Sequence, residues 1–252
     1  MKGGNGEGQR ATIGKHMPTP RPTTNEPNRG VYPAAEAARI AHLGPRRVSR
    51  WLGGYTYALR DGSARDSKPV FPRLHGGESI ALTFADLIEL LYVKHFVDQG
   101  VTMPWVKRLH EEARAEFGVA HPFAAKRFET DGKSIFHRFI HEGRERLEDR
   151  KRMQIVERTV FNPLMRRIDH NVVTEAASLY WPMGKNRLIV LDPMRSFGEP
   201  IVARSHVPTR VLFAAVRKGG EPRTRVAKWY GVTPAEVDAA IAYEESLNQR
   251  AA

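Results

Sequence analysis

The sequence predicts an α+β fold that is mainly α. Helical spacing of apolar residues dominates the N-terminal and C-terminal thirds, and short extended segments lie between them. Of the 252 residues, 41% are apolar, which is enough to bury a hydrophobic core. Because the chain contains no cysteine, disulfide scaffolds and cysteine-based zinc modules are excluded.

The length predicts more than one domain. We expect a tag and disordered N-terminus at 1–28, a winged helix-turn-helix domain with a helical pair at 29–125, a small β-containing connecting region at 126–191, and a trihelical module at 192–252. The polar, Gly-rich segment Met1–His16 lacks the apolar core of a signal peptide, and the sequence has no run of about 18 apolar residues. We therefore expect a soluble, cytoplasmic protein.

The basic charge is concentrated in one part of the chain. The formal net charge is +12. Residues 29–75 hold nine Lys and Arg against three Asp and Glu, a net of +6, whereas residues 76–137 have a net of −2. A basic cluster attracts phosphate backbones and acidic surfaces. The clustering favours nucleic acid as a partner of the N-terminal domain.

Two short helices separated by a Gly turn are predicted within residues 33–53. Pro33 and Pro45 each suit the first turn of a helix. In the second helix, Val48 and Leu52 share the inward face and leave a basic outer face. This is the pattern of a helix-turn-helix, whose second helix would enter the major groove of DNA.

A β wing is predicted to follow, with an aromatic-rich strand at Tyr55–Arg60, an Asp-Gly turn and a second extended segment at Pro69–Leu74. Basic side chains on such a wing could reach the sugar-phosphate backbone beside the groove. The alternative is that the helical hairpin is ordinary scaffolding. The predicted DNA-binding residues of the second helix and the wing are Arg46, Arg47, Ser49, Arg50, Tyr55, Arg60, Arg65 and Lys68.

Two longer helices are predicted next. Thr83 and Asp86 form a capping-box-like start to a helix that is apolar around most of its circumference. Thr102 can cap the following helix, and Lys107 is expected on the solvent-exposed face of that helix. The first of these helices must be buried on two sides. We expect its extra apolar surface to form a dimer interface, with burial inside one chain as the alternative.

The connecting region is predicted to form a small sheet. Lys126–Phe139 has the pattern of a hairpin, with an Asp-Gly turn suited to positive φ. A short helix is expected from Asn162 to Ile168. Two further extended segments, Val172–Trp181 and Arg187–Leu191, could pair with the hairpin.

Three helices are predicted in the C-terminal module, at Pro208–Arg217, at Pro222–Tyr230 and from Thr233 to Leu247. The last two are split by Gly231 and could form a second helix-turn-helix. Acidic residues on the final helix of this pair would repel DNA, so they favour a protein partner there. The acidic residues are Glu236, Asp238, Glu244 and Glu245.

The C-terminal module resembles a small trihelical family of formerly unknown function, whose members commonly look like antitoxins beside PIN-like ribonuclease toxins. One departure is that Arg204-Ser205-His206 replaces the Arg-Gly-Thr commonly found there, so a turn that tolerated positive φ is open to rearrangement. The segments that carry the resemblance are Asp192-Pro193, Phe197–Val202, Val207–Val211, Val226–Thr233 and Val237–Tyr243.

The front of the chain, Glu36–Arg39 with Arg47–Leu52, is similar to a MerR-like helix-turn-helix. The order of the two modules is similar to that of the longer VapB-type antitoxins. The resemblance implies a type II antitoxin that represses its own operon through the N-terminal domain and neutralises a cognate PIN-like toxin by direct contact. It would act as a homodimer or as a hetero-oligomer with the toxin.

A PIN-like toxin would hold acidic residues around magnesium, so an antitoxin could block that pocket with a basic side chain or cover the substrate groove. The alternative is that the basic residues of the C-terminal module only keep the surface soluble. The candidate toxin-binding residues are Arg210, Arg217, Arg223 and Arg225.

No catalytic or metal site is predicted, because the sequence has no zinc-protease, phosphate-loop or nucleophile-elbow motif. His137 and His141 are four residues apart, but no acids complete a site beside them. We therefore expect a protein that is not an enzyme and binds no cofactor. Two other classes stay open. One is a stand-alone MerR-like transcription regulator with a small-molecule effector bound in the middle portion, and the other is an RNA-binding adaptor.

Overall fold

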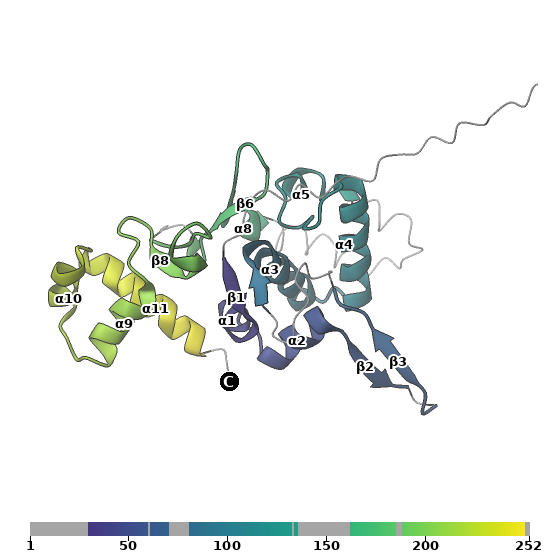
Figure 1. Cartoon of the computed structure of the whole chain (residues 1–252), viewed down its shortest axis with the longest axis horizontal. Coiled ribbons are helices and arrows are strands. Elements are labelled where there is room, and N and C mark those ends of the chain that lie inside the picture. Colours follow the sequence, from purple (N-terminus) through teal and green to yellow (C-terminus); the bar gives the residue numbers. More distant parts are fainter. Residues whose placement is uncertain are drawn as a thin grey trace, which may run out of the picture.

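The N-terminal helices gather at one end of the molecule and the C-terminal helices at the other, with a small sheet between them (Figure 1). The predicted class, α+β and mainly α, is confirmed. None of the described helices has the length and apolar character needed to cross a membrane. The computed structural model describes residues 30–59, 61–70, 81–132, 134–135, 162–184 and 188–249.

The predicted pair of short helices is present. Strand β1 (Val31–Pro33) leads into α1 (Ala34–Ile40), and a turn connects α1 to α2 (Pro45–Gly53). Pro45 occupies the first turn of α2, where its missing N–H costs no hydrogen bond. Val48 and Leu52 are fully buried, so α2 turns the predicted face inward.

The predicted wing is present as an antiparallel hairpin that projects from α2 (Figure 1). Its strands are β2 (Tyr55–Ala58) and β3 (Ala64–Ser67). The second strand therefore comes earlier than the predicted segment Pro69–Leu74, of which residues 71–74 lie outside the described residues. The cause is a tight turn in which Asp61 accepts hydrogen bonds from the backbone N–H and the hydroxyl of Ser63, at 2.9 and 2.6 Å.

Helix α3 (Phe84–Asp98) starts at a complete capping box. The Asp86 N–H donates to the Thr83 hydroxyl at 3.2 Å, and the Asp86 carboxylate accepts from the Thr83 N–H at 2.8 Å. Strand β4 (Ala81–Thr83) precedes α3 and pairs with β1. The sheet formed by β1 and β4 leads directly into α3. Helix α3 lies in the middle of the N-terminal part, where other elements pack around it.

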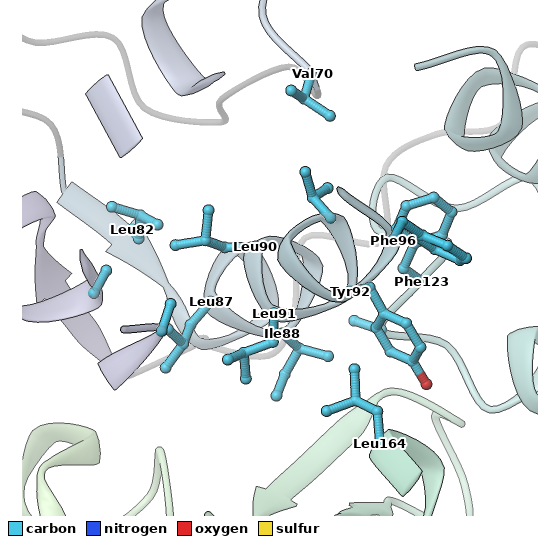
Figure 2. Close-up of a cluster of buried hydrophobic side chains, with 14 of the residues drawn as sticks. Val70, Leu82, Leu87, Ile88, Leu90, Leu91, Tyr92, Phe96, Phe123 and Leu164 are labelled. Atoms are coloured by element: carbon cyan, nitrogen blue, oxygen red, sulfur yellow. The ribbon is translucent and has the colours of Figure 1, made fainter. Parts of the chain in front are cut away.

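The apolar surface of α3 is covered within the chain (Figure 2). Leu87, Ile88 and Leu90 are completely buried. Tyr92 packs edge-on against Phe128, with ring centroids 5.3 Å apart. The expectation that α3 forms a dimer interface is therefore wrong, because other elements of the same chain cover the apolar residues of α3.

Helix α4 (Met103–Phe117) follows α3 as predicted, with Thr102 at its N-cap position, but the Thr102 side chain makes no capping hydrogen bond. The chain then forms α5 (Arg127–Thr130). The hairpin predicted for Lys126–Phe139 is wrong in its described part. The Asp-Gly dipeptide suggested a hairpin turn, but burial of Phe128 against the aromatic core favours a helical turn here. Residue 133 and residues 136–139 lie outside the described residues.

A four-stranded antiparallel sheet joins the connecting region to the C-terminal module. In spatial order its strands are β5 (Ile168–His170), β6 (Ala177–Tyr180), β7 (Ile189–Leu191) and β8 (Pro200–Val202). The predicted short helix is α8 (Asn162–Met165), which ends before Ile168 because Ile168 begins β5. Of the predicted strand Val172–Trp181, only β6 is extended.

The predicted trihelical module is present as α9 (Thr209–Arg217), α10 (Arg223–Tyr230) and α11 (Pro234–Gln249). A capping box starts α11, since the Thr233 N–H donates to Glu236 at 2.6 Å and the Glu236 N–H donates to the Thr233 hydroxyl at 3.2 Å. In the turn before α9, His206 takes the positive φ, at 61°. The fully buried residues of the helical core include Leu212, Val226, Val237 and Ala240.

Candidate functional site

The outer face of α2 carries the predicted DNA-binding side chains. Because burial of Val48 and Leu52 fixes the rotation of the helix, the other side is left to solvent. Arg46, Arg47, Ser49 and Arg50 are all exposed there. The three arginines and Tyr55 also line one open hollow of about 600 Å³. The structure therefore brings these predicted residues together on one surface.

Arg50 links α2 to the wing. Its guanidinium lies 4.0 Å from the centre of the Tyr55 ring, a cation–π contact. Tyr55 in turn lies beside Tyr57, with ring centroids 5.9 Å apart. The stacking restricts the Arg50 side chain, so less conformational entropy remains to be lost when it binds an acceptor.

The wing has two different faces. In the hairpin register, Tyr57 lies opposite Arg65, and Tyr55 lies opposite Ser67. On the other face, the Thr56 hydroxyl donates to Asp66 at 2.6 Å. Because side chains alternate along a strand, the face that continues from Arg50 is aromatic and basic, while the other face carries an acid.

The base of the wing is held against the rest of the N-terminal part. Gly54 has φ 74°, and a Cβ there would lie 2.6 Å from the Ser67 carbonyl oxygen, so only glycine fits without a shift. Lys107 of α4 donates to the Ser67 hydroxyl at 3.0 Å and to the Lys68 carbonyl. Burial lowers the pKa of Lys107, against the opposite effects of Tyr55 and Glu111.

Lys107 was missed by the sequence reasoning, which left it in solvent. Its contact with the wing spans about 40 residues of chain, and no local pattern signals a partner at that separation. The remaining predicted wing residues are not equally placed. Arg65 and Lys68 are exposed, and Arg60 lies outside the described residues.

The four candidate toxin-binding arginines are exposed, and each is paired with an acid of the C-terminal part. Arg210 contacts Glu199 at 2.9 Å, Arg223 contacts Asp238 at 2.8 Å, and Arg225 contacts Glu221 at 2.9 Å. Arg217 is paired with Glu245. Exposed pairs contribute only about 0–1 kcal/mol, so a partner can replace them.

The predicted acidic outer face of α11 is only partly correct. Glu236 and Glu244 are each only 4% exposed and turn inward. Arg204 binds both carboxylate oxygens of Glu236, at 3.1 and 3.0 Å, and the hydrogen bonds from Arg204 are the first cause of a lowered Glu236 pKa. The outward acids, Asp238 and Glu245, are the ones that pair with arginines.

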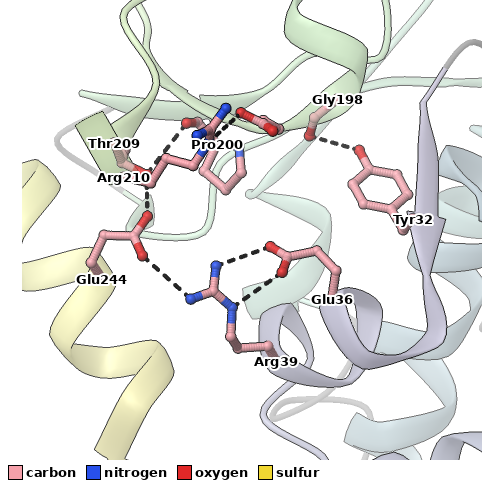
Figure 3. A network of polar contacts seen from close by, with 9 residues as sticks. Tyr32, Glu36, Arg39, Gly198, Pro200, Thr209, Arg210 and Glu244 are labelled. Atoms are coloured by element: carbon pink, nitrogen blue, oxygen red, sulfur yellow. Dashed lines mark hydrogen bonds and ion pairs between the residues drawn. The ribbon is translucent and has the colours of Figure 1, made fainter. Parts of the chain in front are cut away.

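Helices α1 and α11 meet at a polar junction (Figure 3). Arg39 of α1 binds Glu36 at 3.1 Å and reaches Glu244 of α11 at 3.5 Å, while Glu244 also accepts from the Thr209 hydroxyl. Partial burial of Arg39 acts to lower its pKa, but the hydrogen bonds and charge of Glu36, with the charge of Glu244, outweigh it and raise the pKa.

A second contact joins the same two parts of the chain. The Tyr32 hydroxyl donates to the Gly198 carbonyl at 2.9 Å in a buried position (Figure 3). The pKa of Tyr32 is raised by burial, followed by the charges of Asp192 and Glu36. The basic surface of α2 is therefore carried on a unit that is tied directly to the C-terminal module.

Comparison with known proteins finds a family match in the C-terminal part of the chain. Residues 189–243 match the family described as "Protein of unknown function (DUF433)". The match covers β7, β8 and most of the trihelical module, the region in which the sequence resembles a trihelical family.

A curated relative and a solved structure, both from Mycobacterium tuberculosis, are similar to this protein over most of the chain. One, from strain ATCC 25618 / H37Rv, is named "Putative antitoxin VapB45" and is 24% identical over 222 residues, which cover 84% of this chain and 92% of that protein. The other is the crystal structure of Rv2018, with a TM-score of 0.63 at 21% identity, covering 83% of this chain and 96% of that chain. The second likeness shows a shared fold.

Within the described ranges, no group of three or more His, Asp or Glu side chains is arranged to hold a metal ion. His137 and His141 lie outside those ranges. His110 Nε2 lies 2.8 Å from Glu89 Oε2, and both side chains are buried in the aromatic core, where the His110 ring packs against Phe123. What the described surface offers is binding chemistry, through arginines, aromatic rings and exposed apolar side chains.

Proposed function

We propose that this chain is the antitoxin of a type II toxin–antitoxin system, and that it is not an enzyme. The observation that carries the proposal is its similarity, along 84% of its length, to a protein named as an antitoxin. Because 84% of the chain is longer than either part alone, the similarity extends into both the basic N-terminal part and the C-terminal module, which supports one role for the two together.

In this proposal the N-terminal part is a MerR-like winged helix-turn-helix that binds operator DNA. Helix α2 enters the major groove, where Arg47 and Arg50 can bind guanine edges or phosphates and Ser49 can add a hydrogen bond. Arg65 and Lys68 contact the backbone beside the groove. Two copies on a palindromic operator would place their α2 helices about 34–36 Å apart, or a multiple of that distance.

The C-terminal module contacts the toxin, which we take to be a PIN-like ribonuclease with an acidic magnesium site. The paired arginines are suited to this role because an exposed ion pair is weak and can exchange its acid for one of the partner's. At a protein interface, a close charge pair with complementary geometry can contribute more than the exposed pair it replaces. The antitoxin would block the pocket or cover the substrate groove.

Co-expression with the product of the adjacent reading frame tests the proposal. We expect the two chains to co-purify, and we expect the ribonuclease activity of the partner to be lost in the complex. A chain that binds operator DNA but neither binds nor inhibits that product would instead be a stand-alone regulator, and a small molecule that alters its DNA affinity would identify it as effector-controlled.

A further inference from the structure

An exposed aromatic residue stands on the loop between β7 and β8. Phe197 is 82% exposed, and Met194 on the same loop is 64% exposed. Large apolar side chains gain free energy from burial, which these two obtain little of within their own chain. Exposed apolar residues are common singly, so exposure alone does not assign a role.

The backbone of Phe197 makes the position unusual. Ser196, Phe197 and Gly198 adopt φ of 45°, 54° and 85° in succession. Glycine takes such values freely, but a bulky residue with a Cβ does so at a cost. A short 3-10 turn, η3 (Ser196–Gly198), therefore holds the phenylalanine in a conformation that its own side chain disfavours.

The surrounding contacts impose this conformation. The Gly198 N–H donates to the Arg195 carbonyl at 2.8 Å, and the Glu199 N–H donates to the Ser196 carbonyl at 3.0 Å. The Gly198 carbonyl is held by the Tyr32 hydroxyl, and a Cβ on Gly198 would overlap that hydroxyl. The loop thus holds the backbone of Phe197 in a fixed conformation, which lowers the backbone entropy lost on binding.

Charged groups stand at both ends of the loop. Arg195 contacts Asp192 at 3.1 Å, and Arg210 contacts Glu199 at 2.9 Å. In each pair the arginine is more exposed than its acid, so the groups that a partner meets first are positive. Aromatic residues, Met and Arg are also the residue types enriched at protein interfaces.

We propose that Phe197, supported by Met194, is the apolar anchor with which this chain docks onto its toxin. The toxin would offer an apolar pocket rimmed by acidic side chains, which the flanking arginines complement. This inference rests on the proposed antitoxin function and adds a contact site to it. The fold uses the backbone of this loop at Gly198, but it makes no use of the Phe197 side chain, which stays 82% exposed on a costly backbone conformation, as is common at functional sites.

The test is Phe197→Gly in the full chain, with the dissociation constant measured against the product of the adjacent reading frame. Glycine accepts the positive φ, so the melting temperature should be unchanged or higher. We expect affinity to fall at least 30-fold, the usual loss at an aromatic hot spot. Val172→Gly is the matched control, because Val172 is an exposed apolar residue on another turn, and it should leave the affinity unchanged.

The other outcomes are distinct. Wild-type affinity in Phe197→Gly would overturn the anchor and leave the antitoxin function standing. Failure of the unmodified chain to bind that product would overturn both. A lower melting temperature together with lost binding would make Phe197 structural. A change from dimer to monomer without loss of toxin affinity would mean that a second copy occupies the site. Phe197→Leu, which keeps an apolar side chain, should retain more affinity than Phe197→Gly.

Discussion

The contact between Arg50 and Tyr55 gives a quantitative test of DNA binding by α2. If Arg50 binds a base, Arg50→Ala should weaken binding by about 1–3 kcal/mol, which is about 5-fold to 150-fold. Tyr55 lies 4.0 Å from the guanidinium and acts by holding it in place. Because an exposed cation–π contact is worth about 0.5–1 kcal/mol, Tyr55→Leu should weaken binding about 2-fold to 5-fold.

The two substitutions should not be additive. Once Arg50 is absent, the ring has no guanidinium to orient, so the double variant should bind DNA about as weakly as Arg50→Ala alone. The assay is a titration of duplex DNA from upstream of the chain's own reading frame, at one fixed salt concentration. Ala64→Ser, on the opposite face of the wing, is the control and should bind like wild type.

Full additivity of the two losses would refute the stacking argument, because Tyr55 would then contact DNA independently or act through the fold. A melting temperature measured for each variant separates these two cases. If the wild-type chain bound the duplex and neither substitution had any effect, α2 would not be the helix that reads DNA.

Three further outcomes are expected. Gly54→Ala should weaken DNA binding and lower the melting temperature by displacing the wing, whereas Gly53→Ala, where a Cβ meets nothing within 4 Å, should do neither. Arg39→Ala should lower the free energy of unfolding by about 2 kcal/mol, because buried Glu244 loses a charged partner. The control is Arg217→Ala, in an exposed pair, which should lower it by less than about 1 kcal/mol. Denaturant unfolding of the two variants measures both values. Burial, followed by the charge of Lys94, lowers the pKa of His95 to about 4 in the folded chain. As the pH falls, His95 is therefore protonated in the unfolded chain before it is protonated in the folded chain. Stability should then fall as the pH drops from about 6.5 towards 4, by about 2 kcal/mol at pH 5, and His95→Gln should remove that part of the pH dependence in thermal melts; an unchanged slope would contradict the assignment.

Local signals in the sequence predicted most of the helices. The capping boxes at Thr83 and Thr233 are patterns of four residues, and both form the predicted hydrogen bonds. Helical spacing also predicted the inward face of α2, formed by Val48 and Leu52. These features depend on neighbours within one or two turns, so a single sequence contains the information needed to find them.

The errors occur where distant contacts decide the structure. The Asp-Gly dipeptide after Phe128 suggested a hairpin, but the Phe128 ring packs among aromatic side chains contributed by α3 and the loop after α4. Similarly, the apolar residues around α3 predicted that the helix must be buried on two sides. They did not distinguish burial inside one chain from burial against a second copy. Tertiary packing, which the spacing of residues does not encode, determined both outcomes.

Glu244 shows why the site was harder to predict than the fold. As one of four acids on α11 it appeared to belong to an exposed face, yet it is buried between the Thr209 hydroxyl and Arg39 of α1. A buried carboxylate needs such partners, and one of them lies 205 residues away in the sequence. Because α1 also packs against α2, the same ion pair helps to fix the basic surface of α2 relative to the C-terminal module. The charge of Glu244 therefore stabilises the junction between α1 and the C-terminal module, and in the proposed function the exposed arginines are the charges that contact a partner.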